Sequence, residues 1–182
     1  NVSRVLSELD VKSVATGFIA GFTGKALKEE MQNLGIETLF TELPDGFSRV
    51  NIKIKSGEET EINGAGPIVS EEYLDKFLDS LSVLKNGDVL VLAGSVPKSV
   101  PDNIYEIIME RFSGKGIKFV VDASGELFKK VLPLKPYLIK PNHIELGEIF
   151  GGEINTPDEA EIYARKLQSM GALNVIVSMA EK

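Results

Sequence analysis

Along most of the chain, continuous apolar runs of strand length take turns with segments whose apolar residues recur at helical spacing. Residues 88–93 and 117–121 are nearly continuous apolar runs of strand length, whereas Tyr73, Phe77 and Leu81 recur at helical spacing. Strands that are apolar on both faces are typical of a parallel sheet, which the intervening helices must cover. The pattern therefore predicts an α/β fold with a mainly parallel sheet and helices on both of its faces.

The same pattern sets the expected boundaries of the elements. A turn over residues 21–24 is expected to open a helix that runs to Leu34, and a short helix is expected to carry Leu127 and Val131. Strands are expected at residues 13–19, 38–41, 88–93, 117–121, 137–139 and 173–177. Further helices are expected over residues 1–9 and from residues 70, 101, 142 and 156 onward.

Residues 48–63 differ from the rest because their pattern alternates strictly. Val50, Ile52 and Ile54 fall on one face, Ser56-Gly57 is a turn signal, and the chain then returns. This predicts a hairpin with one apolar face, whose acidic residues Glu58, Glu59 and Glu61 are solvated. The hairpin would leave the main sheet, and its apolar face must pack on something, such as a ligand cleft or a second subunit.

Composition narrows the range of functions. The 182 residues suit one α/β domain, and the net charge of −7 argues against a nucleic-acid partner. Without cysteine, disulfides and thiolate chemistry are excluded, which fits a reducing cytoplasm. No apolar run approaches membrane-spanning length, so no membrane partner is expected. His143 is the sole histidine and is expected to be a surface residue at a helix start rather than a base.

The stretch from Tyr137 to Leu146 places charged and polar groups where a strand gives way to a helix. Pro141 ends the strand after Lys140, and Asn142 is a good helix N-cap. Lys140 would then stand at the carboxyl end of a strand beside a helix N-terminus, which suits an anion. Asn142 and Glu145 also have the spacing of a capping box, so capping and a functional role remain alternatives.

Two preceding strands also end in polar or glycine residues. Gly94-Ser95 follows one, and Asp122 with Ser124 follows the next. In a parallel sheet these ends and Lys140 would lie at one edge and could converge on one ligand, with Ser95 donating to an oxyanion. Each also has an ordinary explanation, since Gly94-Ser95 suits a turn and Asp122 or Ser124 suits a helix cap. Neither a Walker loop nor a dinucleotide fingerprint is present.

Six motifs in this order and spacing resemble the phosphofructokinase-B type of sugar kinases. The resemblance covers the whole chain and is greatest to bacterial 1-phosphofructokinases, followed by tagatose-6-phosphate kinases. The segment that begins at Asn1 also resembles the one after the family's glycine-rich substrate loop. The motifs are Gly17-Phe-Ile-Ala-Gly21-Phe-Thr-Gly24, Ser48-Arg49-Val50-Asn51-Ile-Lys-Ile54, Glu61-Ile-Asn63-Gly64, Gly94-Ser95-Val96-Pro97, Asp122-Ala-Ser124-Gly125 and Lys140-Pro-Asn142-x-x-Glu145.

This resemblance implies a ribokinase-like fold, with the hairpin at about residues 48–63 serving as a β-lid. It implies that Asn1, Arg49 and Ser95 bind the sugar phosphate, since an arginine fork suits phosphate oxygens. Lys140 and Asn142 would bind ATP, and Glu145 would hold Mg²⁺ indirectly, through water. The hairpin would also join two subunits in a homodimer.

Two departures from the family pattern stand out. Ser48 replaces the threonine that the family has before Arg49, which keeps the hydroxyl. The family's catalytic aspartate, in a glycine-rich anion hole, would fall after Lys182, so no catalytic base is expected within the chain, which looks cut at both ends.

The resemblance implies ATP-dependent conversion of fructose 1-phosphate to fructose 1,6-bisphosphate by the full-length protein, with the 182-residue chain alone inactive. The alternatives are a tagatose-6-phosphate kinase and a non-catalytic fragment that binds a sugar phosphate or a nucleotide.

Overall fold

A computed structural model describes residues 1–56, 58–123 and 126–179. Gly57 of the predicted hairpin turn and Ser124-Gly125 of the fifth motif lie outside the described residues. The chain divides into two compact units, which are described separately. The first comprises Asn1–Val83 with Pro97–Val100, and the second comprises Leu84–Val96 with Pro101–Lys182.

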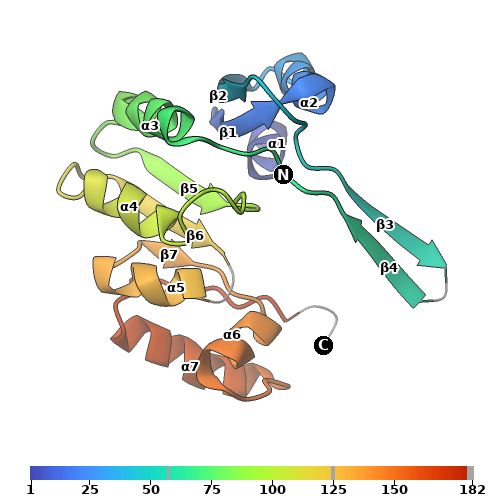
Figure 1. The fold of residues 1–182 in the computed structure, drawn as a ribbon. Coiled ribbons are helices and arrows are strands. Elements are labelled where there is room, and N and C mark those ends of the chain that lie inside the picture. The colour runs from blue at the N-terminus through green and yellow to red at the C-terminus, as the bar shows by residue number, and fades with distance from the viewer. Residues whose placement is uncertain (57, 124–125, 180–182) are drawn as a thin grey trace. The chain divides into compact units, whose positions relative to one another are not determined.

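The first unit contains a β-α-β arrangement followed by a hairpin and a helix (Figure 1). Strands β1 and β2 pair in parallel, with Val14 opposite Glu37 and Ala20 opposite Leu43. The elements are α1 (Val2–Glu8), β1 (Val14–Ala20), α2 (Gly21–Asn33), β2 (Glu37–Leu43), β3 (Asn51–Ser56), β4 (Glu58–Asn63), α3 (Glu71–Ser80) and the 3₁₀ turn η1 (Leu81–Val83).

Apolar packing holds the β1–α2 junction of this unit together. Ile19 and Ala20 at the end of β1 are buried, and Phe18 packs on Phe77 of α3 with ring centroids 4.7 Å apart. A Cβ at Gly24 would lie 2.9 Å from the Ile19 Cβ, so glycine lets α2 approach β1 closely. The expected turn at residues 21–24 is therefore already the first turn of α2.

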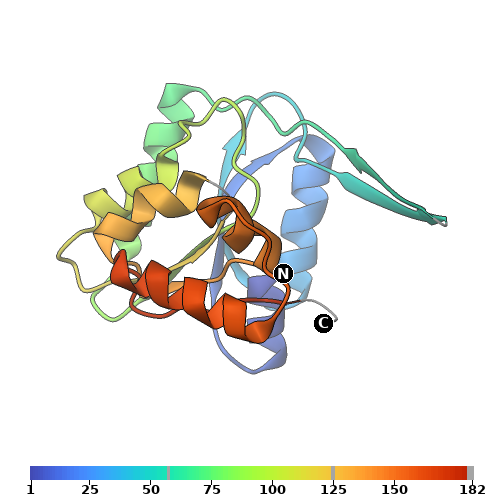
Figure 2. The same cartoon turned by 90° about the horizontal axis from the view of Figure 1, so that it is seen from below.

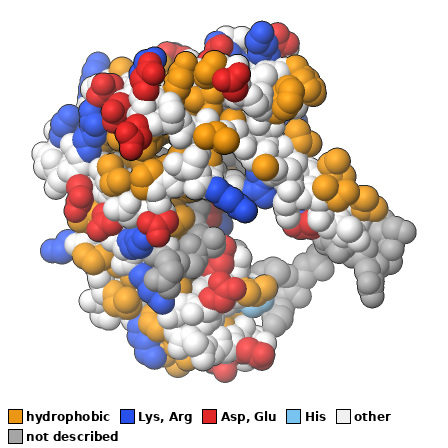
Figure 3. All heavy atoms as spheres, viewed as in Figure 1, with side chains coloured by type: hydrophobic (Ala, Val, Ile, Leu, Met, Phe, Trp, Pro, Cys, Tyr) orange, Lys and Arg blue, Asp and Glu red, His pale blue; other side chains and the backbone are white. Residues whose placement is uncertain are grey.

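The hairpin predicted at about residues 48–63 is confirmed as the antiparallel pair β3–β4. Asn51 lies opposite Asn63, and Ile52 lies opposite Ile62. Figures 1 and 2 show the pair extending away from β1, β2 and α2 of the same unit. Its apolar side chains are about half exposed, with Ile52 at 50% and Ile62 at 54%, and orange side chains mark the hairpin in Figure 3. The first unit thus leaves the apolar face of its hairpin uncovered.

The second unit is built on parallel strands in the order β5-β6-β7. The segment after α7 continues the sheet, because Val175 and Ser178 form parallel bridges to Ile139 and Asn142. The elements are β5 (Val89–Ala93), α4 (Ile104–Arg111), β6 (Lys118–Asp122), α5 (Glu126–Val131), the 3₁₀ turn η2 (Leu132–Leu134), β7 (Leu138–Ile139), α6 (His143–Phe150) and α7 (Pro157–Ser169).

The core of the second unit lies on one face of this sheet. Alternate strand residues are buried there, and apolar helix side chains contribute to the same core. The fully or nearly fully buried residues include Leu90, Leu92, Phe119, Val121, Ile139, Ile104, Ile108 and Phe128. Val91 and Val120, which point to the other face, are only partly buried. The parallel strands predicted from the apolar runs are thus confirmed, and they form one hydrogen-bonded sheet in each unit.

Most boundaries lie within one or two residues of the sequence-based prediction, and two elements differ more clearly. Helix α4 begins at Ile104 rather than at Pro101, because Pro101 starts a turn in which its carbonyl accepts the Ile104 N–H at 3.1 Å. Within residues 173–177 only Val175 forms a β-bridge, so the expected strand is not formed. Within the described residues, no helix is both long and apolar enough to cross a membrane.

Candidate functional site

The carboxyl ends of β5, β6 and β7 lie at one edge of the second unit's sheet, as predicted. The strands are parallel and in register, with Ala93 opposite Asp122 and Val121 opposite Ile139. Gly94 follows β5 with a φ of +89°, a left-handed conformation that favours glycine. Ser95, next to it, is exposed. The edge therefore presents Ser95, Asp122 and Lys140 from three consecutive strand ends.

Lys140 and Asp122 form an ion pair at this edge. The Lys140 Nζ lies 3.1 Å from the Asp122 Oδ1, and both side chains are about two-fifths exposed, at 42% and 39%. The backbone adds to the link, because the Lys140 N–H donates to the Val121 carbonyl at 3.0 Å. Asp122 therefore orients a cation at the sheet edge, a role the sequence analysis did not assign to it.

Asn142 and Glu145 form the capping box that their spacing predicted. The Asn142 Oδ1 accepts the Glu145 N–H at 2.8 Å, and the Glu145 carboxylate accepts the Asn142 N–H at 2.8 Å. The His143 N–H donates to the Ser178 carbonyl at 3.0 Å, which ties the start of α6 to the last sheet segment. The capping interpretation is confirmed, and it fixes both side chains beside Lys140.

The described residues hold no cluster of three His, Cys, Asp or Glu side chains that could bind a metal ion. Glu145 is half-buried and already accepts one backbone N–H. A site with a single carboxylate does not fit a cation that needs a protein cage. It fits Mg²⁺, which keeps most of its waters and uses one or two carboxylates together with substrate phosphates.

His143 is the first residue of α6, as expected from its position in the sequence. Its Nδ1 is buried, and within the described residues it has no hydrogen-bond partner. It lines a cavity of about 450 Å³ together with Gly147, Glu148 and Ile154. No described carboxylate bonds to its ring, and the expectation that His143 is not a base stays a prediction.

Arg49 is exposed at the base of the hairpin and is held by two asparagine side chains. Its Nε donates to the Asn51 Oδ1 at 2.7 Å, and its Nη2 donates to the Asn63 Oδ1 at 2.9 Å. Asn51 and Asn63 are cross-strand partners. Arg49 was expected to be solvated or to bind phosphate, but its two amide partners were missed. The strict alternation could have revealed them, since it places residues 49, 51 and 63 on the polar face.

The backbone before Arg49 is fixed to the start of α2. The Ser48 Oγ accepts the Ala20 N–H at 3.0 Å, the Ser48 N–H donates to the Ala20 carbonyl at 3.0 Å, and the Thr23 hydroxyl donates to the Ser48 carbonyl at 3.0 Å. A Cβ at Gly24 would lie 2.9 Å from the Ser48 Oγ, so glycine keeps this space open. The first two motifs therefore meet and position Arg49.

Glu61 is exposed, as predicted, and it also joins the polar face of the hairpin. It pairs with Lys53, and its carboxylate accepts the Asn63 amide N–H at 3.4 Å. The hydrogen bond from Lys53, followed by that from Asn63, lowers the pKa of Glu61 below its ordinary value. The side chains of Glu58 and Glu59 lie outside the described residues.

Asn1 and Arg49 belong to the first unit, whereas Ser95, Lys140, Asn142 and Glu145 belong to the second. Asn1 is exposed and precedes α1, and its carbonyl accepts the Val5 N–H at 3.1 Å. The Asn1 side chain makes no cap hydrogen bond to α1.

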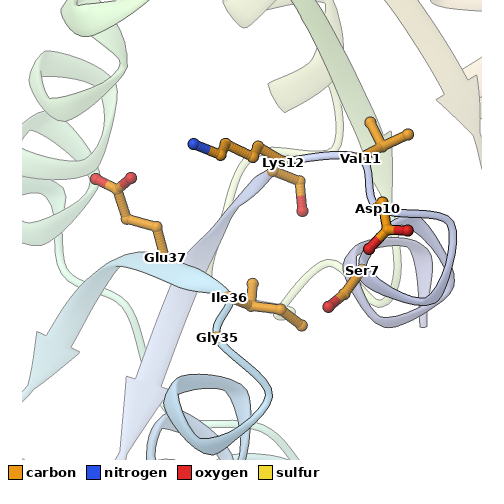
Figure 4. Close-up of a pocket in the computed structure, with 8 residues that line it drawn as sticks. Ser7, Asp10, Val11, Lys12, Gly35, Ile36 and Glu37 are labelled. Atoms are coloured by element: carbon orange, nitrogen blue, oxygen red, sulfur yellow. The ribbon is translucent and has the colours of Figure 1, made fainter.

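A cavity of about 440 Å³ in the first unit contains none of the candidate residues (Figure 4). It is lined by Ser7 and Asp10 near the end of α1, by Lys12 before β1, and by Glu37 at the start of β2. It thus lies at the amino ends of the two strands. Ligands of open α/β sheets bind outside the carboxyl ends of the strands, so this cavity is not the expected substrate site.

Comparison with known proteins matches residues 1–182 to the pfkB family of carbohydrate kinases. The 1-phosphofructokinase of Bacillus subtilis is 47% identical over 180 residues, which cover 99% of this chain and 59% of that protein. The D-tagatose-1-phosphate kinase of Bacillus licheniformis is 35% identical over 179 residues, with 98% of this chain and 59% of that protein covered. The chain thus spans about three-fifths of the length of these relatives.

A solved structure confirms the predicted ribokinase-like fold. Phosphofructokinase-2 from Escherichia coli, in complex with fructose-6-phosphate, superposes with a TM-score of 0.86 over 98% of this chain and 60% of that one. Its 24% identity supports the fold alone. The family match covers the whole chain and agrees with the six ordered motifs. The chain belongs to the pfkB family of carbohydrate kinases.

Proposed function

We propose that the full-length protein transfers the γ-phosphoryl group of ATP to fructose 1-phosphate and forms fructose 1,6-bisphosphate. The observation that carries this proposal is the 47% identity to a 1-phosphofructokinase across 99% of the chain. The clustering of Lys140, Asp122, Asn142 and Glu145 at the carboxyl edge of a parallel sheet supports it.

The existing phosphate of the sugar would be bound by Arg49 and Ser95, and Asn1 would contact the sugar. Arg49 suits this role because its planar fork binds phosphate oxygens in pairs. The Asn51 and Asn63 amide oxygens orient the guanidinium without adding a negative charge of their own. In the same proposal the β3–β4 hairpin is the lid of a single kinase domain, and it closes over the substrates and excludes water, a competing phosphoryl acceptor.

ATP would be bound by Lys140 and Asn142, with Glu145 holding the waters of Mg²⁺. Lys140 supplies a positive charge beside the N-terminus of α6, where negatively charged phosphates are favoured. Bound Mg²⁺ would neutralise charge on the ATP phosphates. The capping box keeps the Glu145 carboxylate in place. A general base is expected outside residues 1–182, and the 182-residue chain by itself is proposed to be inactive.

The proposed assembly is a homodimer in the cytoplasm, formed through the hairpin. Val50, Ile52, Ile54 and Ile62 are between 46% and 54% exposed, and burial against a second copy would remove them from water. Sedimentation of the full-length protein tests this. A dimer that an Ile52→Glu substitution converts to a monomer is expected, and a monomeric wild type would contradict it.

Release of ADP by the full-length protein tests the reaction. Fructose 1-phosphate, tagatose 6-phosphate and tagatose 1-phosphate are compared side by side, because relatives of this chain are named for kinases of each tagatose phosphate. The highest kcat/KM is expected with fructose 1-phosphate. A higher value with a tagatose phosphate would reassign the substrate, and saturable binding without ADP release would favour a non-catalytic binding protein.

A further inference from the structure

The polar face of the hairpin forms a continuous chain of side-chain contacts that includes Arg49. Lys53 pairs with Glu61, Glu61 accepts the amide of Asn63, and Asn63 accepts the Nη2 of Arg49. On β3, opposite Asn63, the Asn51 Oδ1 accepts a hydrogen bond from the Arg49 Nε–H. The Asn51 and Asn63 contacts of 2.7 and 2.9 Å are of hydrogen-bond length for a charged donor.

We infer that Asn51 and Asn63 are positioning residues that fix the guanidinium of Arg49 and thereby set the protein's affinity for the phosphate group of its sugar substrate. The inference rests on the proposed function of Arg49. Two acceptors on different nitrogens define the plane of a guanidinium, which a single acceptor does not. The two asparagines come from paired strands, so the plane is fixed relative to the ladder itself.

The chemistry of the two acceptors is as informative as their geometry. A carboxylate at position 51 or 63 would orient Arg49 equally well, but it would also neutralise the positive charge that attracts a phosphate. An amide oxygen accepts the same hydrogen bond without a net charge. Glu61 reaches this group through Asn63, since the Asn63 amide donates to the Glu61 carboxylate. These two hydrogen bonds therefore orient the cation without adding a negative charge of their own.

Alanine and aspartate variants of the full-length protein separate orientation from charge. Asn51→Ala and Asn63→Ala remove one acceptor each, and Asn51→Asp and Asn63→Asp keep an acceptor while adding a negative charge. Binding of fructose 1-phosphate is measured by isothermal titration calorimetry. Each variant is expected to raise Kd about tenfold, which corresponds to 1.4 kcal/mol. Gln32→Glu, on the exposed surface of α2, adds the same charge away from the hairpin and is expected to leave Kd unchanged.

The same substitutions in an Arg49→Ala background distinguish positioning from direct contact. If the asparagines act only through Arg49, they add nothing to the loss that Arg49→Ala already causes. Additive losses would show that the asparagines contact the ligand or act through the hairpin, and would overturn the inference. Alanine variants with Kd within twofold of the wild type would overturn it as well.

The result expected if the proposed function is wrong differs from the result expected if only the inference is wrong. If the function is wrong, the wild-type protein itself binds none of fructose 1-phosphate, tagatose 6-phosphate and tagatose 1-phosphate, and the inference falls with the function. If the wild type binds one of these ligands, that ligand replaces fructose 1-phosphate in the series. A ¹⁵N spectrum of the arginine Nε groups checks the geometry without ligand. Slow exchange of the Arg49 Nε–H in the wild type, lost in Asn51→Ala, is expected, and fast exchange in the wild type would contradict the inference.

Discussion

Two cations of this molecule are held in place by different means. Arg49 is oriented by neutral amides on a hairpin whose strands make extensive contacts only with each other among the described elements. Lys140 is paired with a carboxylate at the edge of a sheet whose strands are buried against helices. A substitution in the hairpin can therefore change ligand contacts without changing the core. At the sheet edge, a substitution that changes ligand contacts is also expected to change the stability of the second unit.

The largest expected effect is on the hairpin side of this comparison. Arg49→Ala in the full-length protein should raise the KM for the sugar phosphate by about 10- to 100-fold, since a hydrogen bond to a charged group contributes about 1.5–3 kcal/mol. The KM for ATP and the thermal midpoint should stay unchanged, because Arg49 is exposed and outside the core. Steady-state kinetics and calorimetry check this. A fall in the thermal midpoint would break the proposed separation of ligand binding from stability.

The next largest effect concerns Tyr105, a buried residue of α4. Burial, followed by the charge of Asp122, raises the pKa of Tyr105 to about 12. The folded protein thus holds this proton more tightly than the unfolded chain, so the stabilisation is complete below pH 10 and is lost as pH rises toward 12.

Denaturant unfolding at pH 9 and pH 11.5 measures this loss, which can reach about 2 kcal/mol for one group. Tyr105→Phe should remove the loss that Tyr105 causes. A variant with the same pH dependence as the wild type would show that Tyr105 ionises normally in the fold.

A smaller effect is expected at the capping box. Asn142→Ala should lower the free energy of unfolding by about 1 kcal/mol, the usual cost of losing an N-cap. It should also raise the KM for ATP, because the cap fixes the start of α6 beside Lys140. Thr156→Ala, which removes the equivalent cap of α7, is the matched control. It should cost similar stability and leave the KM for ATP unchanged, and an equal rise in both variants would remove Asn142 from the ATP site.

The smallest effects are expected at two ion pairs, Lys140 with Asp122 and Lys53 with Glu61. Asp122→Asn should cost less than about 1 kcal/mol of stability, because partly exposed pairs contribute little. It should raise the KM for ATP by loosening Lys140. Lys53→Met, at the exposed pair of the hairpin, should leave the thermal midpoint unchanged. If Asp122→Asn left the KM for ATP unaltered, Lys140 would not depend on its partner.

Much of the fold could be predicted because local signals agreed with the final structure. The apolar runs gave β5 and β6, the alternation gave the hairpin, and Pro141 with Asn142 gave the junction before α6. The last segment was harder. Residues 173–177 have an apolar pattern, but within them only Val175 forms a β-bridge, and the next bridge is at Ser178. Such detail depends on backbone hydrogen bonds that the pattern does not encode.

The candidate site could be predicted only in part. The sequence indicated that Lys140 stands at a strand end, but not that Asp122 pairs with it, since the partner depends on the register between β6 and β7. Likewise, Arg49 was recognised as a cation, whereas its asparagine partners required the pairing of β3 with β4. Local residue types predicted the positions of charged groups, and only the strand registers showed which groups meet.

The register of the hairpin also limits how related sequences can differ in length. Every residue of β3 lies opposite one residue of β4, from Asn51 opposite Asn63 to Ser56 opposite Glu58. Lengthening the ladder at its tip adds one residue to each strand. A single insertion within a strand would instead turn its later side chains to the opposite face or force a bulge. Among proteins that keep both asparagines, the segment between them is therefore expected to gain or lose residues in pairs.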